Sequence, residues 1–169
     1  MKSFALALGL IGALSVGNAH ALKSDAEQPI NIRAKHVDAN EKTGVAIYRG
    51  NVVLTQGSLR LEAERMEVTT RDGRAQLLRA WGNPVRLRAR SDKGEDLRAQ
   101  ANRTEYHASA RRIDLYERVS LKRDADVVNS AVIHYQMENG TFTAEGGNDG
   151  QVTAVIQPAP KEKEKEKRP

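Results

Sequence analysis

The side chains that could perform acid–base or nucleophilic chemistry are scattered along this sequence. Beyond the N-terminal segment its histidines are His36, His107 and His134, and none belongs to a His-Glu-x-x-His metal motif. No serine stands in a Gly-x-Ser-x-Gly context, no Gly-x-x-x-x-Gly-Lys phosphate loop occurs, and the pair Glu95-Asp96 lies in loop-like sequence. Cysteine is absent, which excludes disulfides and thiolate metal sites. We therefore predict no enzyme activity, no metal and no cofactor.

Charge is the second chemical feature. The formal net charge is +5, but most basic residues are interleaved with acids, as over residues 62–67. That pattern is typical of a solvated strand face and predicts no nucleic-acid binding. The exception is the stretch of residues 86–90, where alternation would point Arg86, Arg88 and Arg90 the same way. Two interpretations of this stretch remain open: a solvated charged edge, and a patch for phosphate groups.

The sequence divides into three parts. Lys2 precedes an apolar run over residues 4–16 that ends in the small-x-small pattern Ala19-His20-Ala21, so residues 1–21 are predicted to be a cleaved signal peptide. The run is shorter than the about 20 apolar residues that a membrane-spanning helix needs. Residues 22–157 have the length of one domain. Residues 158–169 alternate Lys and Glu, and we expect them to be a disordered charged tail.

The predicted domain carries an internal repeat. Four segments show two alternating positions, then a small residue, then a change of phase, and their small residues are Ala34, Ala63, Ala101 and Ser130. Because strand side chains alternate between faces, a step of three would swap the buried set unless a bulge or corner bends the strand. We therefore predict strands that bend at each small residue, with both halves facing one interior.

Short alternating segments between the repeats predict further strands, at residues 45–48, 52–55, 76–81, 85–88, 112–116, 119–122, 141–144 and 152–156. Asp72-Gly73 and Asn139-Gly140 favour tight hairpins between strands. No window has a convincing helical period. Since one repeat cannot bury its apolar face alone, the units must stack. The predicted fold is all-β: a twisted antiparallel roll, open at both ends, built from stacked repeat units.

Alternation assigns a set of large side chains to the interior of this roll. They are Ile30, Ile32, Val37, Ile47, Val52, Leu54, Leu59, Leu61, Met66, Val68, Leu78, Trp81, Leu87, Tyr106, Leu115, Leu121, Ile133, Tyr135 and Phe142. With Tyr106 and Tyr135 inside, His107 and His134 should face outward and be solvated. Two interpretations of the interior remain open: a packed core, and a groove for an apolar ligand, which the scarcity of aromatic residues favours.

A roll open at both ends leaves its first and last strands without partners on one side. The residues concerned are Ile30, Asn31, Ile32 and Arg33 at the first edge, and Val152, Thr153, Ala154, Val155 and Ile156 at the last. The last segment contains no charge, proline or bulge of the kind that blunts an edge strand. We therefore predict that both edges pair with other strands, including head-to-tail self-association of copies.

Four stretches, taken in order, resemble a known family. They are Gln28-Pro29-Ile30-Asn31-Ile32, Tyr48-Arg49-Gly50-Asn51-Val52-Val53-Leu54-Thr55-Gln56-Gly57, Trp81-Gly82-Asn83-Pro84 and Val152-Thr153-Ala154-Val155-Ile156-Gln157-Pro158. Their order and spacing are similar to those of the periplasmic lipopolysaccharide-transport bridge proteins, also called organic-solvent-tolerance domain proteins. The sequence departs from the pattern at Glu117-Arg118, where a third Gly-Asn is expected.

The resemblance implies a fold and a function. The fold is an antiparallel β-jelly roll whose interior residues, named above, hold the acyl chains of lipopolysaccharide in the periplasm. The implied partners are an inner-membrane-anchored transport component at the N-terminal edge and an outer-membrane lipopolysaccharide assembly protein at the C-terminal edge. The alternative is a structural β-oligomer, or a secreted binding module, that carries no lipid.

Overall fold

The part of the chain that the computed structural model describes, residues 25–91, 94–147 and 150–158, folds almost entirely into strands. Its elements are the 3-10 helix η1 (Asp25–Glu27) and the strands β1 (Asn31–Arg33), β2 (His36–Asn40), β3 (Val45–Gln56), β4 (Leu59–Arg71), β5 (Arg74–Arg90), β6 (Asp96–His107), β7 (Arg112–Arg123), β8 (Asp126–Gln136), β9 (Thr141–Glu145) and β10 (Thr153–Val155). The expected signal peptide, and all of the expected tail except Pro158, lie outside the described residues. Within them, no helix is long and apolar enough to cross a membrane.

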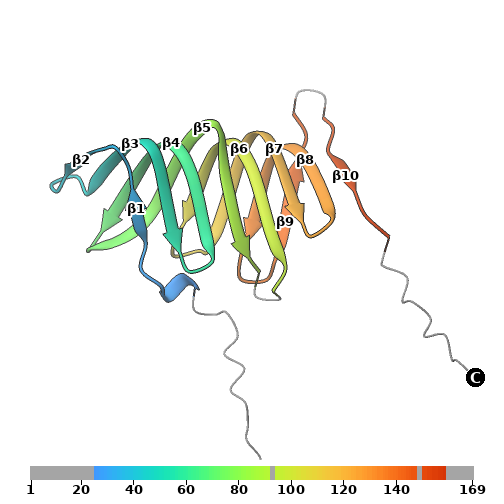
Figure 1. The fold of residues 1–169 in the computed structure, drawn as a ribbon, viewed down its shortest axis with the longest axis horizontal. Helices are drawn as coiled ribbons and strands as arrows, with labels where there is room; N and C mark the ends of the chain where they lie inside the picture. Colours follow the sequence, from blue (N-terminus) through green and yellow to red (C-terminus); the bar gives the residue numbers. More distant parts are fainter. Residues whose placement is uncertain (1–24, 92–93, 148–149, 159–169) are drawn as a thin grey trace, which may run out of the picture.

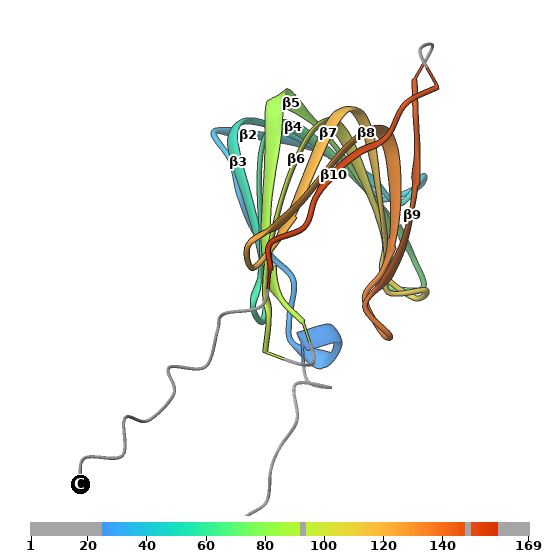
Figure 2. The same ribbon diagram turned by 90° about the vertical axis from the view of Figure 1, so that its right-hand side faces the viewer.

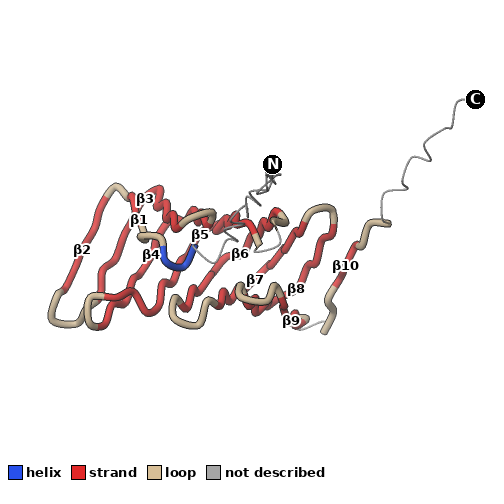
Figure 3. The backbone as a smooth tube through the Cα atoms, turned by 90° about the horizontal axis from the view of Figure 1, so that it is seen from below, coloured by secondary structure: helices blue, strands red, loops and turns tan. Residues whose placement is uncertain are grey.

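The ten strands of the described residues belong to one antiparallel sheet, and eight of them follow the order β1-β3-β4-β5-β6-β7-β8-β10. At one end β1 and β2 pair with the two halves of β3, and at the other end β10 and β9 pair with the two halves of β8. Figures 1 and 3 show these ends on opposite sides of the molecule. No ladder between described strands joins the two ends, so the roll is open, as predicted. In such sheets each strand is rotated by about 20–25° from its neighbour.

Each long strand turns a corner near its middle. The register shifts there in every ladder from β3 to β8, and Figure 2 shows the strands bending over between two halves. The shift falls at the predicted small residues Ala63 in β4 and Ala101 in β6, and next to Ser130 in β8. In β3 the corner is made by Gly50 and Asn51, whose φ angles of 78° and 49° lie in the left-handed region that glycine and asparagine tolerate best. The predicted bent strands are confirmed.

Glu117 and Arg118 show that the corner does not require glycine. Their φ angles are 64° and 52°, and they occupy the place in β7 that Gly50 and Asn51 occupy in β3. A residue with a side chain pays roughly 1–2 kcal/mol in this region. The ladders on both sides of β7 outweigh that cost, so the departure from the Gly-Asn pattern leaves the corner intact.

The corners divide the sheet into two limbs that face each other (Figure 2), and we name them after their inward side chains. The aliphatic limb comprises β1, β10 and residues 52–56, 59–62, 85–90, 96–100, 119–123 and 126–129. The aromatic limb comprises β2, β9 and residues 45–49, 65–71, 74–81, 103–107, 112–116 and 132–136. The hydrophobic core lies between them.

Candidate functional site

The inward side chains form two continuous rows, one on each limb, that run from one end of the sheet to the other. The row on the aliphatic limb is Ile32, Leu54, Leu61, Leu87, Ala99, Leu121, Val128 and Ala154. The row on the aromatic limb is Val37, Tyr48, Met66, Ala80, Thr104, Leu115, Ile133 and Ala144. Because directly paired residues in a sheet share a face, the interior presents mostly apolar surface along its whole length.

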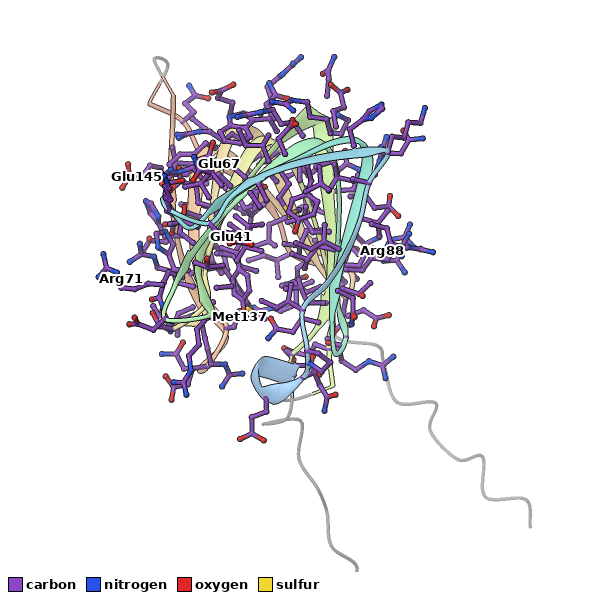
Figure 4. All side chains as sticks on the ribbon, turned by 90° about the vertical axis from the view of Figure 1, so that its left-hand side faces the viewer. Glu41, Glu67, Arg71, Arg88, Met137 and Glu145 are labelled. Carbon is purple, nitrogen blue, oxygen red and sulfur yellow. The ribbon has the colours of Figure 1, made fainter. Side chains whose placement is uncertain are left out.

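Most residues that were predicted to be interior do face the interior. The buried ones are Val52, Leu54, Leu59, Leu61, Met66, Val68, Leu78, Leu87, Tyr106, Leu115, Leu121, Ile133 and Tyr135. Ile30, Ile32 and Phe142 are partly buried and pack against them. Met66 and Ile133 are fully shielded from solvent, and Figure 4, which looks along the roll, shows side chains filling the space between the limbs. Contact between these residues and lipid stays a prediction.

Two of the predicted interior residues face outward, and a third faces inward but is exposed. Ile47 faces outward, because the left-handed corner of β3 keeps the alternation in phase and turns Tyr48 inward instead. Trp81 is also on the outer face, where the guanidinium of Arg65 lies 4.5 Å from its ring centroid. The assignments of Ile47 and Trp81 to the interior are therefore wrong. Val37 belongs to the inner row but is 57% exposed, because β2 is an edge strand.

The free margins of the limbs meet along a seam lined by hairpin turns. The hydroxyl of Tyr106, on the aromatic limb, donates a 3.0 Å hydrogen bond to Oε1 of Gln56 on the aliphatic limb. Both side chains are buried, and burial raises the pKa of the Tyr106 hydroxyl. Next to Gln56, helix η1 is attached to the aliphatic limb, because Asp25 accepts a 2.9 Å hydrogen bond from the backbone N–H of Ser58. The Tyr106–Gln56 bond ties the two limbs together at this point.

Farther along the seam the limbs are less tightly joined. Arg123 of the aliphatic limb lies opposite Leu97 in the ladder and so belongs to the inner face. With Ser91 and Glu95 from the same limb and Met137 from the other, it lines a hollow of about 130 Å³. Figure 4 shows Met137 at the lower end of the aromatic limb. The seam therefore has one hydrogen-bonded stretch and one hollow stretch.

Thr104 is the buried polar residue of its row. Its side chain is 1% exposed, and its Oγ1 has no hydrogen-bond partner among the described residues. A buried hydroxyl without a partner costs about 1–3 kcal/mol. A polar atom of a molecule bound in the interior would find a donor or acceptor here.

The outer face of the aromatic limb carries a network around Asp114, whose side chain is only 2% exposed. His134 Nδ1 lies 2.8 Å from one carboxylate oxygen, while His107 Nε2 and Arg112 Nη2 lie 2.9 and 3.0 Å from the other. Burial alone would raise the pKa of Asp114, but the hydrogen bonds from His134 and Arg112 outweigh burial and hold the pKa below its ordinary value. His107 and His134 do face outward, but they contact this carboxylate instead of being simply solvated.

This network is the part of the described chain that comes nearest to a metal site. Ligand atoms of Glu105, His107 and Asp114 lie within 4.8 Å of one another. The guanidinium of Arg112 lies 3.0 Å from Asp114, however, and a cation in that position opposes the binding of another. The cluster also sits on the outer face rather than in a cleft between the limbs. We therefore assign it no catalytic or metal-binding role.

Each end of the sheet presents two short strands that have a partner strand on one side only, among the described residues. The predicted edge residues lie there: Ile30 directly precedes β1, and Val152 and Ile156 flank β10. Val155 and Ile156 are 52% and 78% exposed. The second edge strands, β2 and β9, were not recognised as edges from sequence, although the small residue Ala34 marks the corner between β1 and β2. Each end is thus a complete cross-section of the roll, with one edge strand from each limb.

Comparisons with known proteins agree with this geometry. The "Lipopolysaccharide export system protein LptA" of Haemophilus influenzae is 30% identical over 149 residues, which cover 86% of this chain and 87% of that protein. The "Lipopolysaccharide export system protein LptH" of Pseudomonas aeruginosa is 28% identical over 170 residues, which cover 95% and 97% of the two chains.

The fold has a counterpart among solved structures. The crystal structure of Pseudomonas aeruginosa LptH, described as the LptA homologous periplasmic component of a lipopolysaccharide transport device, matches with a TM-score of 0.75 and 24% identity. The match covers 80% of this chain and 99% of that one, and it confirms the expected β-jelly roll. Residues 31–141 match the family described as "LptA/(LptD N-terminal domain) LPS transport protein". The chain therefore belongs to the LptA/LptD N-terminal domain family of lipopolysaccharide transport proteins.

Proposed function

We propose that this protein binds the acyl chains of lipopolysaccharide between its two limbs and carries them as part of the export machinery. The observation that carries the proposal is the pair of inward rows, which continue without a break from β1 and β2 to β9 and β10. An interior lined in this way and open at both ends suits a ligand that enters at one end and leaves at the other. The relatives named as lipopolysaccharide export system proteins support this function.

A carrier is needed because acyl chains do not cross water unaided. Burying one methylene is worth about 0.8 kcal/mol, so exposing a chain of roughly ten methylenes costs on the order of 8 kcal/mol. A continuous apolar slot keeps the chain buried at every step and removes most of that barrier. It also requires no energy source within this protein, so any direction to the movement comes from its partners.

Lipid loading requires the limbs to move apart, because their own side chains fill the interior. The seam is where they can separate, since no strand ladder crosses it between the described strands. The seam is less tightly joined at the hollow beside Arg123 and Met137. It is held closed at the Tyr106–Gln56 hydrogen bond. Acyl chains would then replace contacts between the limbs with contacts to themselves, at little net cost in buried apolar area.

The ends of the sheet are the proposed docking sites. We assign the inner-membrane-anchored transport component to β1 and β2, the outer-membrane lipopolysaccharide assembly protein to β9 and β10, and further copies of this chain to either end. Unpaired backbone groups on edge strands favour such strand addition, and contact between unlike ends can continue as a filament. We place the protein in the periplasm after removal of residues 1–21, which the description of the Pseudomonas aeruginosa relative as periplasmic supports.

Photo-crosslinking in living cells tests the lipid site. A crosslinking residue at Leu61, Met66 or Leu121, all inward, is expected to capture lipopolysaccharide. The matched outward positions Arg60 and Arg65, each a neighbour on the same strand, are expected to capture little. Equal capture at inward and outward positions would contradict a ligand between the limbs.

The alternative, a structural β-oligomer or secreted module without lipid, makes a different prediction for the purified protein. Mass spectrometry after mild extraction should find lipopolysaccharide bound to the exported protein if our proposal holds. Protein that is lipid-free at every step, and that takes up no lipid when mixed with lipopolysaccharide, would favour the alternative.

The docking proposal is tested by light scattering over a range of protein concentrations. We expect the average mass of the unaltered chain to rise with concentration. Truncation after Gly150, which removes β10, and Thr153→Pro, which removes a backbone donor within β10, should both abolish the rise. A truncated chain that assembles as well as the unaltered one would contradict pairing through this strand.

A further inference from the structure

The outer face of the aliphatic limb carries a row of cations. Arg88 of β5, Arg98 of β6 and Lys122 of β7 are direct cross-strand neighbours, and all three are exposed. Figure 4 shows Arg88 pointing away from the roll. Together with Arg86 they line a hollow of about 340 Å³, which we call the outer basic groove. Its other polar side chains, those of Gln100 and Ser120, carry no charge.

The described residues supply no ion-pair partner for this row. None of its cations has a carboxylate within ion-pair distance in the described part of the chain. Glu62 lies opposite Arg86 in the ladder but is paired with Arg60, at 2.8 Å. Asp96 and Asp124 line an adjoining hollow with Arg98 and Lys122 but form no ion pair with either. Asp96 lies 3.7 Å from Arg90, and Asp124 accepts a hydrogen bond from the backbone N–H of Asp96.

Such a row is unfavourable for the fold alone. Adjacent strands lie about 4.8 Å apart, and like charges directly opposite one another in a sheet are destabilising. The chain forms ion pairs on the aromatic limb and also beside this row, between Arg60 and Glu62 and between Arg90 and Asp96, so ion pairing is possible in this sheet. An unpaired row on one face therefore points to an anionic partner outside the chain.

We propose that the outer basic groove binds phosphate-bearing lipid headgroups at a membrane surface. A guanidinium group can donate two parallel hydrogen bonds to the oxygens of one phosphate. The row places two guanidinium groups, of Arg88 and Arg98, in register with the ammonium group of Lys122. An open row of cations across three strands suits a surface that carries many phosphates better than it suits one free ion. The groove lies on the opposite face of the sheet from the proposed cargo, so the two sites do not compete.

A protein partner fits this face less well. Stable protein interfaces are centred on buried apolar or aromatic anchors. The large hydrophobic side chains exposed in the described chain are Val37, Val152, Val155 and Ile156, which lie in or beside the edge strands β2 and β10 rather than among these cations. The groove therefore offers charge and hydrogen bonds without such a centre.

Vesicle co-sedimentation tests the proposal, using the full exported protein. It should bind vesicles made of equal parts phosphatidylcholine and phosphatidylglycerol, bind vesicles of phosphatidylcholine alone much less, and be released by salt. Each basic residue near an anionic bilayer raises partitioning about fivefold. The combined variant Arg88→Gln, Arg98→Gln and Lys122→Gln should therefore bind on the order of a hundredfold more weakly at low salt.

The matched control removes the same charge from the hairpins of the aromatic limb. Lys42→Gln, Arg71→Gln and Arg74→Gln, all at exposed positions, should leave vesicle binding within about twofold of the unaltered protein. Equal losses in both triple variants would show a general charge effect and overturn the proposal. So would release by inorganic phosphate at equal ionic strength, which indicates a site for the free ion, or binding of polyglutamate but not of vesicles, which indicates an acidic protein.

Folding and cargo binding are separate readouts. Removing like charges should leave the unfolding midpoint of the first triple variant unchanged or raised, so weaker binding cannot be attributed to unfolding. Lipopolysaccharide capture at Leu61 should persist in this variant. In protein with an intact groove, a crosslinker at Leu61 that captures no lipopolysaccharide while vesicle binding is normal would count against the interior site. That result would leave the proposal for the outer basic groove unaffected.

Discussion

The two limbs belong to one sheet, but the central cross-strand rows on their outer faces arrange charge differently. On the aromatic limb a chain of ion pairs runs across the strands through Glu67, Arg79 and Glu105, at 3.4 and 3.6 Å. On the aliphatic limb the corresponding cross-strand row is the uncompensated outer basic groove. Strand geometry is the same on both sides, so the difference lies in the choice of side chains. It separates a row whose charges are paired with one another from a row of cations that has no ion pair among the described residues.

The inner faces differ in a parallel way. The aliphatic limb contributes a nearly uniform row of Leu, Ile, Val and Ala. The aromatic limb adds the hydroxyl of Thr104 to its row, and its strands are also held from the outer face by the bonds of His107, His134 and Arg112 to Asp114. Apolar packing accommodates a different partner at little cost, whereas a hydrogen bond depends on one geometry. We therefore regard the aromatic limb as the anchored half and the aliphatic limb as the adaptable half.

The largest effect is expected from placing a charge within the adaptable half. Leu61→Asp puts a carboxylate at a position that is 4% exposed, which should cost ~4 kcal/mol or more of unfolding free energy, or abolish lipid capture if the limbs stay apart. Urea unfolding and in-cell crosslinking measure the two outcomes. Gln100→Asp, on the outer face of the same limb, is the control and should cost under about 0.5 kcal/mol. A stable Leu61→Asp variant with normal lipid capture would show that this residue does not line the interior.

Asp114→Asn, a substitution on the outer face of the aromatic limb, should destabilise the anchored half. Loss of the buried charge beside Arg112 and the two histidines is expected to cost about 2–3 kcal/mol at neutral pH. Because the folded-state pKa of Asp114 is lowered, its charge stabilises the fold above the ordinary aspartate pKa, and this stabilisation is lost as pH falls through the folded pKa. The difference between variant and unaltered protein should therefore shrink in acid. Asp38→Asn, at an exposed ion pair, provides the comparison and should show almost no effect at either pH.

A smaller effect is expected where the limbs are tied together. Tyr106→Phe removes the hydrogen bond to Gln56 and should cost about 1 kcal/mol in chemical unfolding. The same change at Tyr48, an inward tyrosine whose hydroxyl has no such bond among the described residues, should cost less. If both substitutions cost the same, the bond across the seam contributes nothing particular to joining the limbs.

The smallest effect compares the outer faces directly. Arg79→Gln breaks contacts to two carboxylates and should lower the unfolding free energy by roughly 0.5–1 kcal/mol. Arg88→Gln breaks no ion pair and relieves repulsion, so it should be neutral or stabilising by a few tenths of a kcal/mol. Thermal unfolding measures this difference between the variants. The difference should be smaller at high salt than at low salt, since salt screens both effects. A larger loss at Arg88 than at Arg79 would reverse our view of the two faces.

The architecture could be predicted from the sequence because most corners change the phase of the alternating pattern nearby. Ala63 and Ala101 are followed by a change of phase, which only a bent strand can reconcile with one interior. The phase within the other strands was not predictable in the same way. Gly50 and Asn51 absorb the bend in β3 without shifting the alternation, so Tyr48 and not Ile47 turns inward. Whether a corner shifts the phase depends on backbone angles that residue types do not specify.

Contacts across strands were the least accessible to sequence reasoning. His107, Asp114 and His134 come from three neighbouring strands, and their meeting depends on registers set elsewhere in each ladder. The outer basic groove was partly predictable from the sequence. The alternation of Arg86 and Arg88 predicted a shared direction, but only the register of β5 with β6 and β7 brings Arg98 and Lys122 beside them.

The twist of the sheet has a mechanical consequence for anything that moves through the roll. Rotations of about 20° at each of the seven steps between β1 and β10 add up to an angle on the order of 140°. The inward rows therefore form helical paths around the long axis of the roll. A ligand that follows them must rotate about that axis as it moves along. A second copy docked on β10 has to start at the angle where the first one finishes. Edge pairing would then set the angular phase between successive copies as well as their distance.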